Sequence, residues 1–206
     1  MSSVPDRRYT PEEYLAFERA SDTKHEYYAG QIYAMTGASL LHVRIVGNLM
    51  RILGNQLLNS GCVPLCNDLR VKTADGVYTY PDVLVVCDEP LLEDTRKDTL
   101  LNPQIVIEVL SPSTENYDRG NKFVHYQSIA SLEEYILVAQ DRPQVVQYTR
   151  QPDRKDWNSI WLNGLSESLS LKPLACNIPL SELYLQIVFP DDLPLLHPHD
   201  PLASEP

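Results

Sequence analysis

The sequence predicts a mixed α/β fold in which a central mixed β-sheet is flanked by helices. Helical and strand-like segments follow one another as helix, hairpin, helix, three strands, a further strand, helix and two strands. The chain has 206 residues, 43% of them hydrophobic, with no internal repeat and no linker rich in Gly or Ser. We therefore expect a single domain over residues 1–189, with the first helix and hairpin as an N-terminal extension.

The first third of the chain predicts two helices with a hairpin between them. A helix over residues 11–19 has Thr10 as its N-cap, a proline at its first position and a capping-box glutamate. Aromatic and β-branched residues on both sides of an Ala-Gly pair predict a hairpin over residues 25–35. Ser39 can cap a long helix over residues 40–59, in which leucine and isoleucine recur at helical spacing.

The remainder alternates between short strands and one helix. The turn at residues 74–76 separates strand-like runs, and residues 88–102 are charged enough to predict a solvent-facing loop. The expected elements are strands over 63–66, 68–73, 77–87, 105–110, 134–140 and 144–150, an edge hairpin over 151–168, and a helix over 113–129. Residues 190–206 hold five prolines and four acids and predict a flexible tail.

Charge and composition exclude some classes of protein. The formal charge of −11 argues against a protein that coats nucleic acid or an anionic membrane, although residues 27–67 contain no acid. No apolar run approaches a membrane span, and the N-terminus resembles no signal peptide, so we expect a cytoplasmic protein without a membrane partner. The four cysteines lack metal-finger spacing and are expected to be buried, reduced thiols.

Two apolar strands each contain a single acid. Asp82 begins the apolar part of YPDVLVV, and Glu108 lies inside IVIEVL. A carboxylate buried there costs several kcal/mol unless it is paired, protonated or bound to a cation. Either acid alone could mark a strand end or pair with a basic residue, but both together favour a shared divalent ion. Oxygen ligands without a Cys/His cluster favour Mg²⁺ or Mn²⁺ over zinc.

A lysine lies close behind the second acid. Asp118, Lys122 and Tyr126 follow each other at intervals of four, so one helical face presents all three side chains. This spacing is equally typical of a solvated Asp-Lys pair next to a half-buried tyrosine. Its position after Glu108 favours a role for Lys122 in phosphodiester hydrolysis, where an ammonium can stabilise negative charge.

Together these motifs resemble the Uma-type restriction endonuclease family of the PD-(D/E)XK nuclease superfamily. The resemblance covers residues 8–185 and rests on KHEYYAGQI, the helix that contains His42, YPDVLVV, IEVLSPST and the Asp-Lys-Tyr series. It implies a restriction-endonuclease-like core in which a helix precedes a three-stranded meander and a fourth strand follows. It also implies that Asp82 and Glu108 are metal ligands and that Glu26 adds a third acid, which alone would predict only a surface salt bridge.

The chain departs from the superfamily pattern at one position. The usual lysine stands two residues after the second acid, where this sequence has Leu110, so Lys122 is expected to replace it. His42, Arg44, Arg51 and Tyr126 are further candidates for contacts with the substrate.

Three functions are compatible with these residues. A metal-dependent DNA endonuclease, expected as a homodimer because a double-strand cutter needs two active sites, explains the largest number of them. A non-catalytic interaction or regulatory module on a nuclease scaffold is the alternative, supported by the displaced lysine and the acidic composition. Acid-base hydrolysis of a glycoside by the two carboxylates ranks last.

Overall fold

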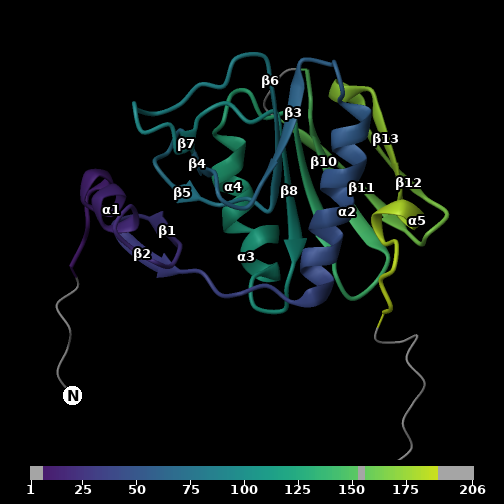
Figure 1. Cartoon of the computed structure of the whole chain (residues 1–206), viewed down its shortest axis with the longest axis horizontal. Coiled ribbons are helices and arrows are strands. Elements are labelled where there is room, and N and C mark those ends of the chain that lie inside the picture. The colour runs from purple at the N-terminus through teal and green to yellow at the C-terminus, as the bar shows by residue number, and fades with distance from the viewer. Residues whose placement is uncertain (1–6, 153–155, 190–206) are drawn as a thin grey trace, which may run out of the picture.

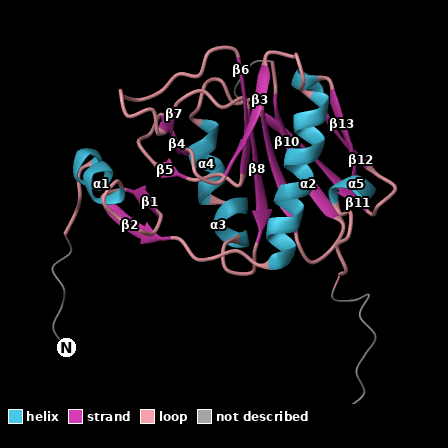
Figure 2. Ribbon diagram, viewed as in Figure 1, coloured by secondary structure: helices cyan, strands magenta, loops and turns pink. Residues whose placement is uncertain are grey.

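The protein is described by a computed structural model over residues 7–152 and 156–189 (Figure 1). Its centre is a mixed sheet of six strands, in the order β11 (Trp157–Asn163), β10 (Gln144–Arg150), β9 (Glu134–Ala139), β8 (Ile105–Leu110), β6 (Val83–Cys87) and β3 (Cys62–Cys66). One face carries α2 (Leu40–Gln56), and the other carries α3 (Glu115–Arg119) and α4 (Asn121–Gln127) (Figure 2). The predicted sheet flanked by helices is confirmed.

The order of these elements matches the core that the resemblance implied. Helix α2 precedes β3, β6 and β8, which pair antiparallel in sequence order, and β9 then pairs parallel to β8. A parallel pair requires a crossover connection, which α3 and α4 supply. The meander therefore brings the start of β6 and the end of β8 to the same edge of the sheet.

Two smaller sheets were not predicted. The first has the order β2 (Gln31–Ala34), β1 (His25–Tyr28), β5 (Tyr78–Thr79), β4 (Arg70–Lys72) and β7 (Thr99–Leu100). The second joins β12 (Ser168–Leu171) to β13 (Cys176–Pro179), with a 3₁₀ turn (Lys172–Leu174) between them and α5 (Leu180–Leu183) after them. The predicted strand over residues 77–87 is in fact two strands in different sheets. Pro81 lies at the break, where it has no N–H to donate to either ladder.

The first three predicted elements are confirmed. Helix α1 (Pro11–Glu18) starts with the expected capping box between Thr10 and Glu13. The hairpin turns at Ala29 and Gly30, which both have positive φ, as a tight two-residue hairpin turn requires. The hydroxyl of Ser39 caps α2 by accepting from the backbone N–H of His42.

Two predictions between residues 88 and 129 need correction. The charged loop contains β7, whose two residues are buried because they pair parallel to β4. The predicted helix over 113–129 is divided at Gly120 into α3 and α4. A Cβ on Gly120 would lie 3.1 Å from the carbonyl oxygen of Asn116, so a larger residue would crowd the backbone at this junction.

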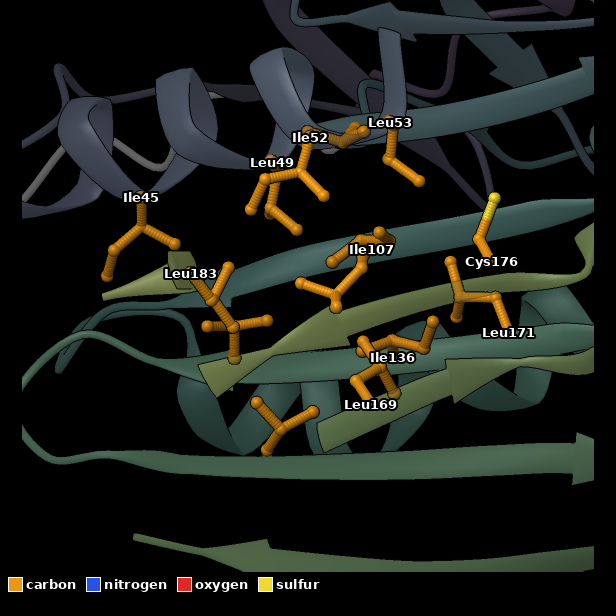
Figure 3. Packing of buried hydrophobic residues seen from close by; sticks show 14 of the residues in the cluster. Ile45, Leu49, Ile52, Leu53, Ile107, Ile136, Leu169, Leu171, Cys176 and Leu183 are labelled. Carbon is orange, nitrogen blue, oxygen red and sulfur yellow. The ribbon is translucent and has the colours of Figure 1, made fainter. Parts of the chain in front are cut away.

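Apolar packing holds the layers together on both faces of the large sheet. Figure 3 shows α2 contributing Ile45, Leu49 and Leu53 toward the sheet residues Ile107 and Ile136. Phe123 and Tyr126 of α4 lie in a second cluster on the opposite face, against alternate residues of the same strands. Strand β8 is therefore buried on both faces, as its continuous apolar sequence predicted.

The expectation of four buried, reduced thiols is wrong. Cys62 and Cys87 face each other across β3 and β6 and form a disulfide. Cys66 is free but exposed, and only Cys176 is a free, buried thiol. Alternation along the strands gave no sign of this pairing, because it depends on the register between β3 and β6.

The expected tail at residues 190–206 lies outside the described residues, and the boundary at residue 189 stays a prediction. Within residues 7–152 and 156–189, no helix combines the length and the apolar character needed to cross a membrane.

Glu134, at the start of β9, should make stability depend on pH. Its side chain is 0% exposed, and burial raises its pKa from 4.5 to about 7, against a hydrogen bond from Gln147. The folded protein therefore holds this proton more tightly than the unfolded chain, so the free energy of unfolding should fall as pH rises from about 4.5 through 7. The loss is about 3 kcal/mol. Urea denaturation between pH 5 and 8 should show it, and Glu134→Gln should remove most of this dependence; an unchanged pH profile in that variant would contradict the assignment.

Candidate active site

Asp82 and Glu108 are brought together by the antiparallel pairing of β6 and β8. Asp82 directly precedes β6, and Glu108 lies near the end of β8, so both reach the same edge of the sheet. The backbone N–H of Val109 donates to Oδ2 of Asp82 at 2.8 Å, and the N–H of Asp82 lies 3.4 Å from Oε2 of Glu108. Each acid thus accepts from the backbone on or next to the other, so the two carboxylates lie side by side.

Lys122 is the cation at the centre of this group of acids. It projects from α4, is only 6% exposed, and its Nζ contacts three carboxylates. The distances are 3.0 Å to Glu108, 3.3 Å to Glu26 and 3.5 Å to Asp118. Lys122 therefore links the helical layer to both the large sheet and the N-terminal hairpin.

The hairpin holds Glu26 against the rest of the site. Oε1 of Glu26 accepts a hydrogen bond from the hydroxyl of Thr79, and the N–H of Tyr80 lies 3.4 Å from the same oxygen. The hydroxyl of Tyr80 in turn donates to Glu18 of α1, which also accepts from the N–H of His25. The N-terminal extension is thus fastened to the strands that precede Asp82.

The charges in this cluster do not balance. Burial raises the pKa of Glu108 well above its usual range, with Lys122 opposing the shift and Asp82 adding to it. Burial likewise raises the pKa of Asp118. Burial would lower the pKa of Lys122, but the neighbouring carboxylates outweigh it and hold that pKa well above its usual range. The ammonium form of Lys122 is therefore favoured, and the cluster places four carboxyl groups, including that of Glu26, around one ammonium group.

These residues open into a cavity of about 770 Å³. Its lining includes Glu26, Asp82, Glu108, Asp118 and Lys122, so the four acids and the lysine face one space. The segment that joins β2 to α2 forms another part of its wall, together with the turn after β8 and two tyrosines. The lining from these parts comprises Tyr33, residues 34–39, Ser111, Pro112, Ser113, Thr114 and Tyr117.

His42 and Tyr126 each hold one of the acids. Nε2 of His42, in the first turns of α2, lies 3.0 Å from Oδ1 of Asp82. The hydroxyl of Tyr126, which is fully buried, donates to Oε1 of Glu108 at 2.9 Å. His42 lines the cavity, whereas Tyr126 supports Glu108 from behind. Tyr126 is therefore placed to orient a carboxylate. Of these two residues, which were both expected to contact the substrate, only His42 lines the cavity.

The geometry agrees with what comparison with known proteins shows. Residues 11–181 match the Uma2 family, whose description is "Putative restriction endonuclease". The chain belongs to the Uma2 family. The family that its motifs resemble is thus confirmed, and with it a nuclease-like classification.

Two curated relatives of this Uma2 family member come from Synechocystis sp. The chain is 38% identical over 189 residues to "Uncharacterized protein slr1290", and the aligned region covers 91% of this chain and 97% of the relative. It is 35% identical over 147 residues to "Uncharacterized protein sll1609", covering 71% of this chain and 83% of the relative. Neither name states an activity.

A solved structure shares the fold of this Uma2 family member. It is the crystal structure of "a putative nuclease belonging to DUF820" from Anabaena variabilis, with a TM-score of 0.72 and 16% sequence identity. The match covers 87% of this chain and 99% of that one. The likeness confirms the restriction-endonuclease-like fold.

The displaced lysine has a structural explanation in this Uma2 family member. Leu110 lies on the same face of β8 as Glu108, but it is buried in the apolar cluster beneath α4. Lys122 reaches Glu108 from that helix over the same face. The ammonium group is therefore supplied by a helix, as expected from its spacing after Glu108, while Leu110 at the strand position packs in the core.

The oxygen ligands suit a hard cation. Within the described residues, no three His, Cys, Asp or Glu side chains form a ready cage for an ion. Mg²⁺ does not require one, because it commonly binds through one or two carboxylates together with water and substrate phosphates. Asp82 and Glu108 provide such a pair, in a cavity whose lining has more acidic side chains than lysines. The residues present therefore fit Mg²⁺ or Mn²⁺.

Arg44 and Arg51 are not brought to the cavity. Arg44 donates to the carbonyl of Gln186, and Arg51 pairs with Glu182, so both fasten α2 to the C-terminal segment. The sequence analysis also missed Thr79, whose hydroxyl holds Glu26. Its place in the alternating strand before Pro81 gave no sign of that contact.

Proposed function

We propose that this protein is an endonuclease that hydrolyses DNA phosphodiester bonds with Mg²⁺ or Mn²⁺. The observation that carries the proposal is the meeting of Asp82, Glu108 and Lys122 in one cavity at the edge of the meander. Membership of a family described as "Putative restriction endonuclease" and the fold shared with "a putative nuclease" support it. The enzyme is then a hydrolase whose substrate is a DNA strand.

Asp82 and Glu108 would hold the metal ion, with Glu26, which also contacts Lys122, as a third acid. Such an ion polarises a phosphate and lowers the pKa of a bound water. The backbone bonds between the two acids fix their carboxylates before any ligand arrives. His42 orients Asp82, and Tyr126 orients Glu108.

Lys122 acts as a fixed positive charge in this proposal. The neighbouring carboxylates raise its pKa well above the usual range, which favours the ammonium form. An ammonium held within 3.0 Å of Glu108 can stabilise negative charge that develops on the phosphate or the attacking oxygen.

Asp82→Asn tests the proposal. The amide oxygen of asparagine can still accept from Val109, so the fold should survive, whereas the negative charge is lost. We expect metal-dependent cleavage of plasmid DNA by the full chain to fall at least about a hundredfold. Asp141→Asn is the matched control, because Asp141 is exposed, pairs with its neighbour Arg142 and lies outside this cavity. Equal cleavage by the parent and Asp82→Asn would contradict the proposal.

A non-catalytic module on the nuclease scaffold is the second candidate. The pairing of Lys122 with three carboxylates favours it, since a bound ammonium already offsets part of the negative charge that a metal would neutralise. Calorimetric titration with Mg²⁺ or Mn²⁺ distinguishes the two functions. Heat of binding that is lost in Asp82→Asn supports the enzyme, and no binding at millimolar metal supports the module.

A homodimer and a cytoplasmic location remain predictions. Strands β3 and β11 are the outer strands of the large sheet, and such edges can pair with a second copy. Size-exclusion chromatography with light scattering would give the oligomeric state directly.

A further inference from the structure

Two tyrosines that line the cavity have rings that stack on no other aromatic ring and lie under no cation among the described residues. The chain has 12 tyrosines, all within the described residues. Ten of them pack their rings against another aromatic ring or under a cation. In the described chain, only Tyr33 and Tyr117 have neither kind of ring contact, and no hydrogen bond from either hydroxyl is seen. Both line the cavity that contains the acids.

The two rings come from β2 and α3, which are distant in the sequence, and both lie near Glu26. Tyr33 of β2 is the direct partner of Glu26 in the hairpin register, so the two side chains leave the same face of the hairpin. Tyr117 of α3 directly precedes Asp118. After burial, the charge of Glu26 contributes most to raising the pKa of Tyr117 to about 12, in accord with its place near that acid.

The exposure of Tyr33 is unusual for a residue of its size beside a buried charge cluster. Its side chain is 51% exposed, and the neighbouring Met35 and Val43 are exposed as well and line the same cavity. One wall of the cavity is therefore apolar and aromatic, while the floor is acidic. Once the acids hold a divalent ion, as proposed above, a ligand that suits both parts has a flat, uncharged group next to an anionic group that contacts the ion, which is the composition of a nucleotide.

The cations of the cavity are already paired. Among the lining residues, Lys24 and Lys122 are the only lysines, and no arginine is present. Lys24 pairs with Asp68, and Lys122 contacts three carboxylates. Proteins that hold duplex DNA derive most of their non-specific affinity from cations on phosphates, which this cavity does not offer. Stacking of bases on aromatic rings needs no such cations.

We propose that Tyr33 and Tyr117 stack on an unpaired base of the strand to be cut, so that the substrate is single-stranded DNA. This inference rests on the proposed function, because it assigns the substrate form of the same site. A cavity of about 770 Å³ is of the size that encloses a small ligand, whereas a duplex site spreads over a wide surface. Base pairing would hide the faces and edges that the two rings would contact.

The test compares binding and cleavage of one short fluorescent oligonucleotide in three forms: single-stranded, annealed to its complement, and single-stranded with abasic sites. Binding is followed by fluorescence anisotropy with Ca²⁺, which also takes oxygen ligands, and cleavage is followed with Mg²⁺. We expect the parent to bind the single strand about tenfold more tightly than the abasic strand, and to cut it faster than the duplex. Tyr33→Ala and Tyr117→Ala should each remove most of this preference. Tyr33→Phe and Tyr117→Phe keep the rings and should behave as the parent does.

The outcomes separate this inference from the proposed function. If the parent cuts duplex as well as single strand and both alanine variants bind like the parent, the inference is wrong while the nuclease proposal stands. If no form is cut, the nuclease proposal fails, and base-dependent binding that only the alanine variants lose would still support the aromatic site. Equal binding of the base-bearing and abasic strands by the parent overturns the inference in either case.

Discussion

Lys122→Met is expected to lower the free energy of unfolding by about 3–5 kcal/mol, the range for breaking a buried ion pair. Methionine fills a similar volume and keeps the apolar contacts of α4, so the loss arises from charge. Without the ammonium, Glu26, Glu108 and Asp118 face one another with no cation in contact, and Glu108 and Asp118 are almost fully buried. Protonation of Glu108, whose pKa burial already raises, would limit the loss.

Urea denaturation at pH 7, followed by circular dichroism, would measure this change. Lys24→Met is the matched control: its ion pair with Asp68 is exposed, so its loss should cost less than about 1 kcal/mol. Lys122→Met together with Glu108→Gln should recover part of the lost stability, since one of the unpaired acids is then neutral. A loss as small as that of the control would show that Lys122 is not needed to balance these carboxylates.

Glu108→Gln should remove activity and spare the fold, whereas Lys122→Met is expected to lower stability. Under the proposed function, cleavage should fall at least about a hundredfold through the loss of a metal ligand. Stability should stay equal or rise, because a carboxyl whose ionised form is disfavoured by burial becomes neutral. The amide oxygen can still accept from Tyr126 and Lys122, which keeps the packing beneath β8.

Cleavage rates and urea denaturation on the same preparations would test both halves of this prediction. Glu167→Gln is a suitable control, since Glu167 is exposed and far along the chain in the loop before β12. Unchanged cleavage in Glu108→Gln would refute the metal role of this residue. A large loss of stability would show that its charge holds Lys122 in place, which would make the acid structural.

The parts of the site that lie on strongly patterned elements could be predicted from the sequence. Two consecutive apolar strands that each contain one acid have few structural explanations, so Asp82 and Glu108 indicated a site as a pair, although Asp82 alone was equally typical of a strand start. Helical spacing together with a position soon after Glu108 indicated Lys122 and Tyr126, although Gly120 divides the helix. Glu26 depended on the family resemblance, because its strand is short and polar and its contact with Lys122 joins residues almost a hundred positions apart.

The features that were missed depend on contacts between elements. The break at Pro81, which sends β5 and β6 to different sheets, follows from pairing partners that no local pattern reveals. The same holds for the disulfide, which requires the register of β3 against β6. Arg44 and Arg51 lie in an acid-free stretch, which suggested a phosphate-facing surface, but α2 uses them against the C-terminal segment.

The reciprocal backbone bonds of Asp82 and Glu108 have a consequence for the thermodynamics of ligand binding. Since the carboxylates are immobilised by the ladder between β6 and β8, their rotamer entropy is already lost when the chain folds. A cation that binds there would find a pre-organised pair and would cause little further ordering of these side chains. The affinity of the ion would then depend on its dehydration and on the negative charge of the acids. Because salt screens such attraction, raising the ionic strength should weaken binding.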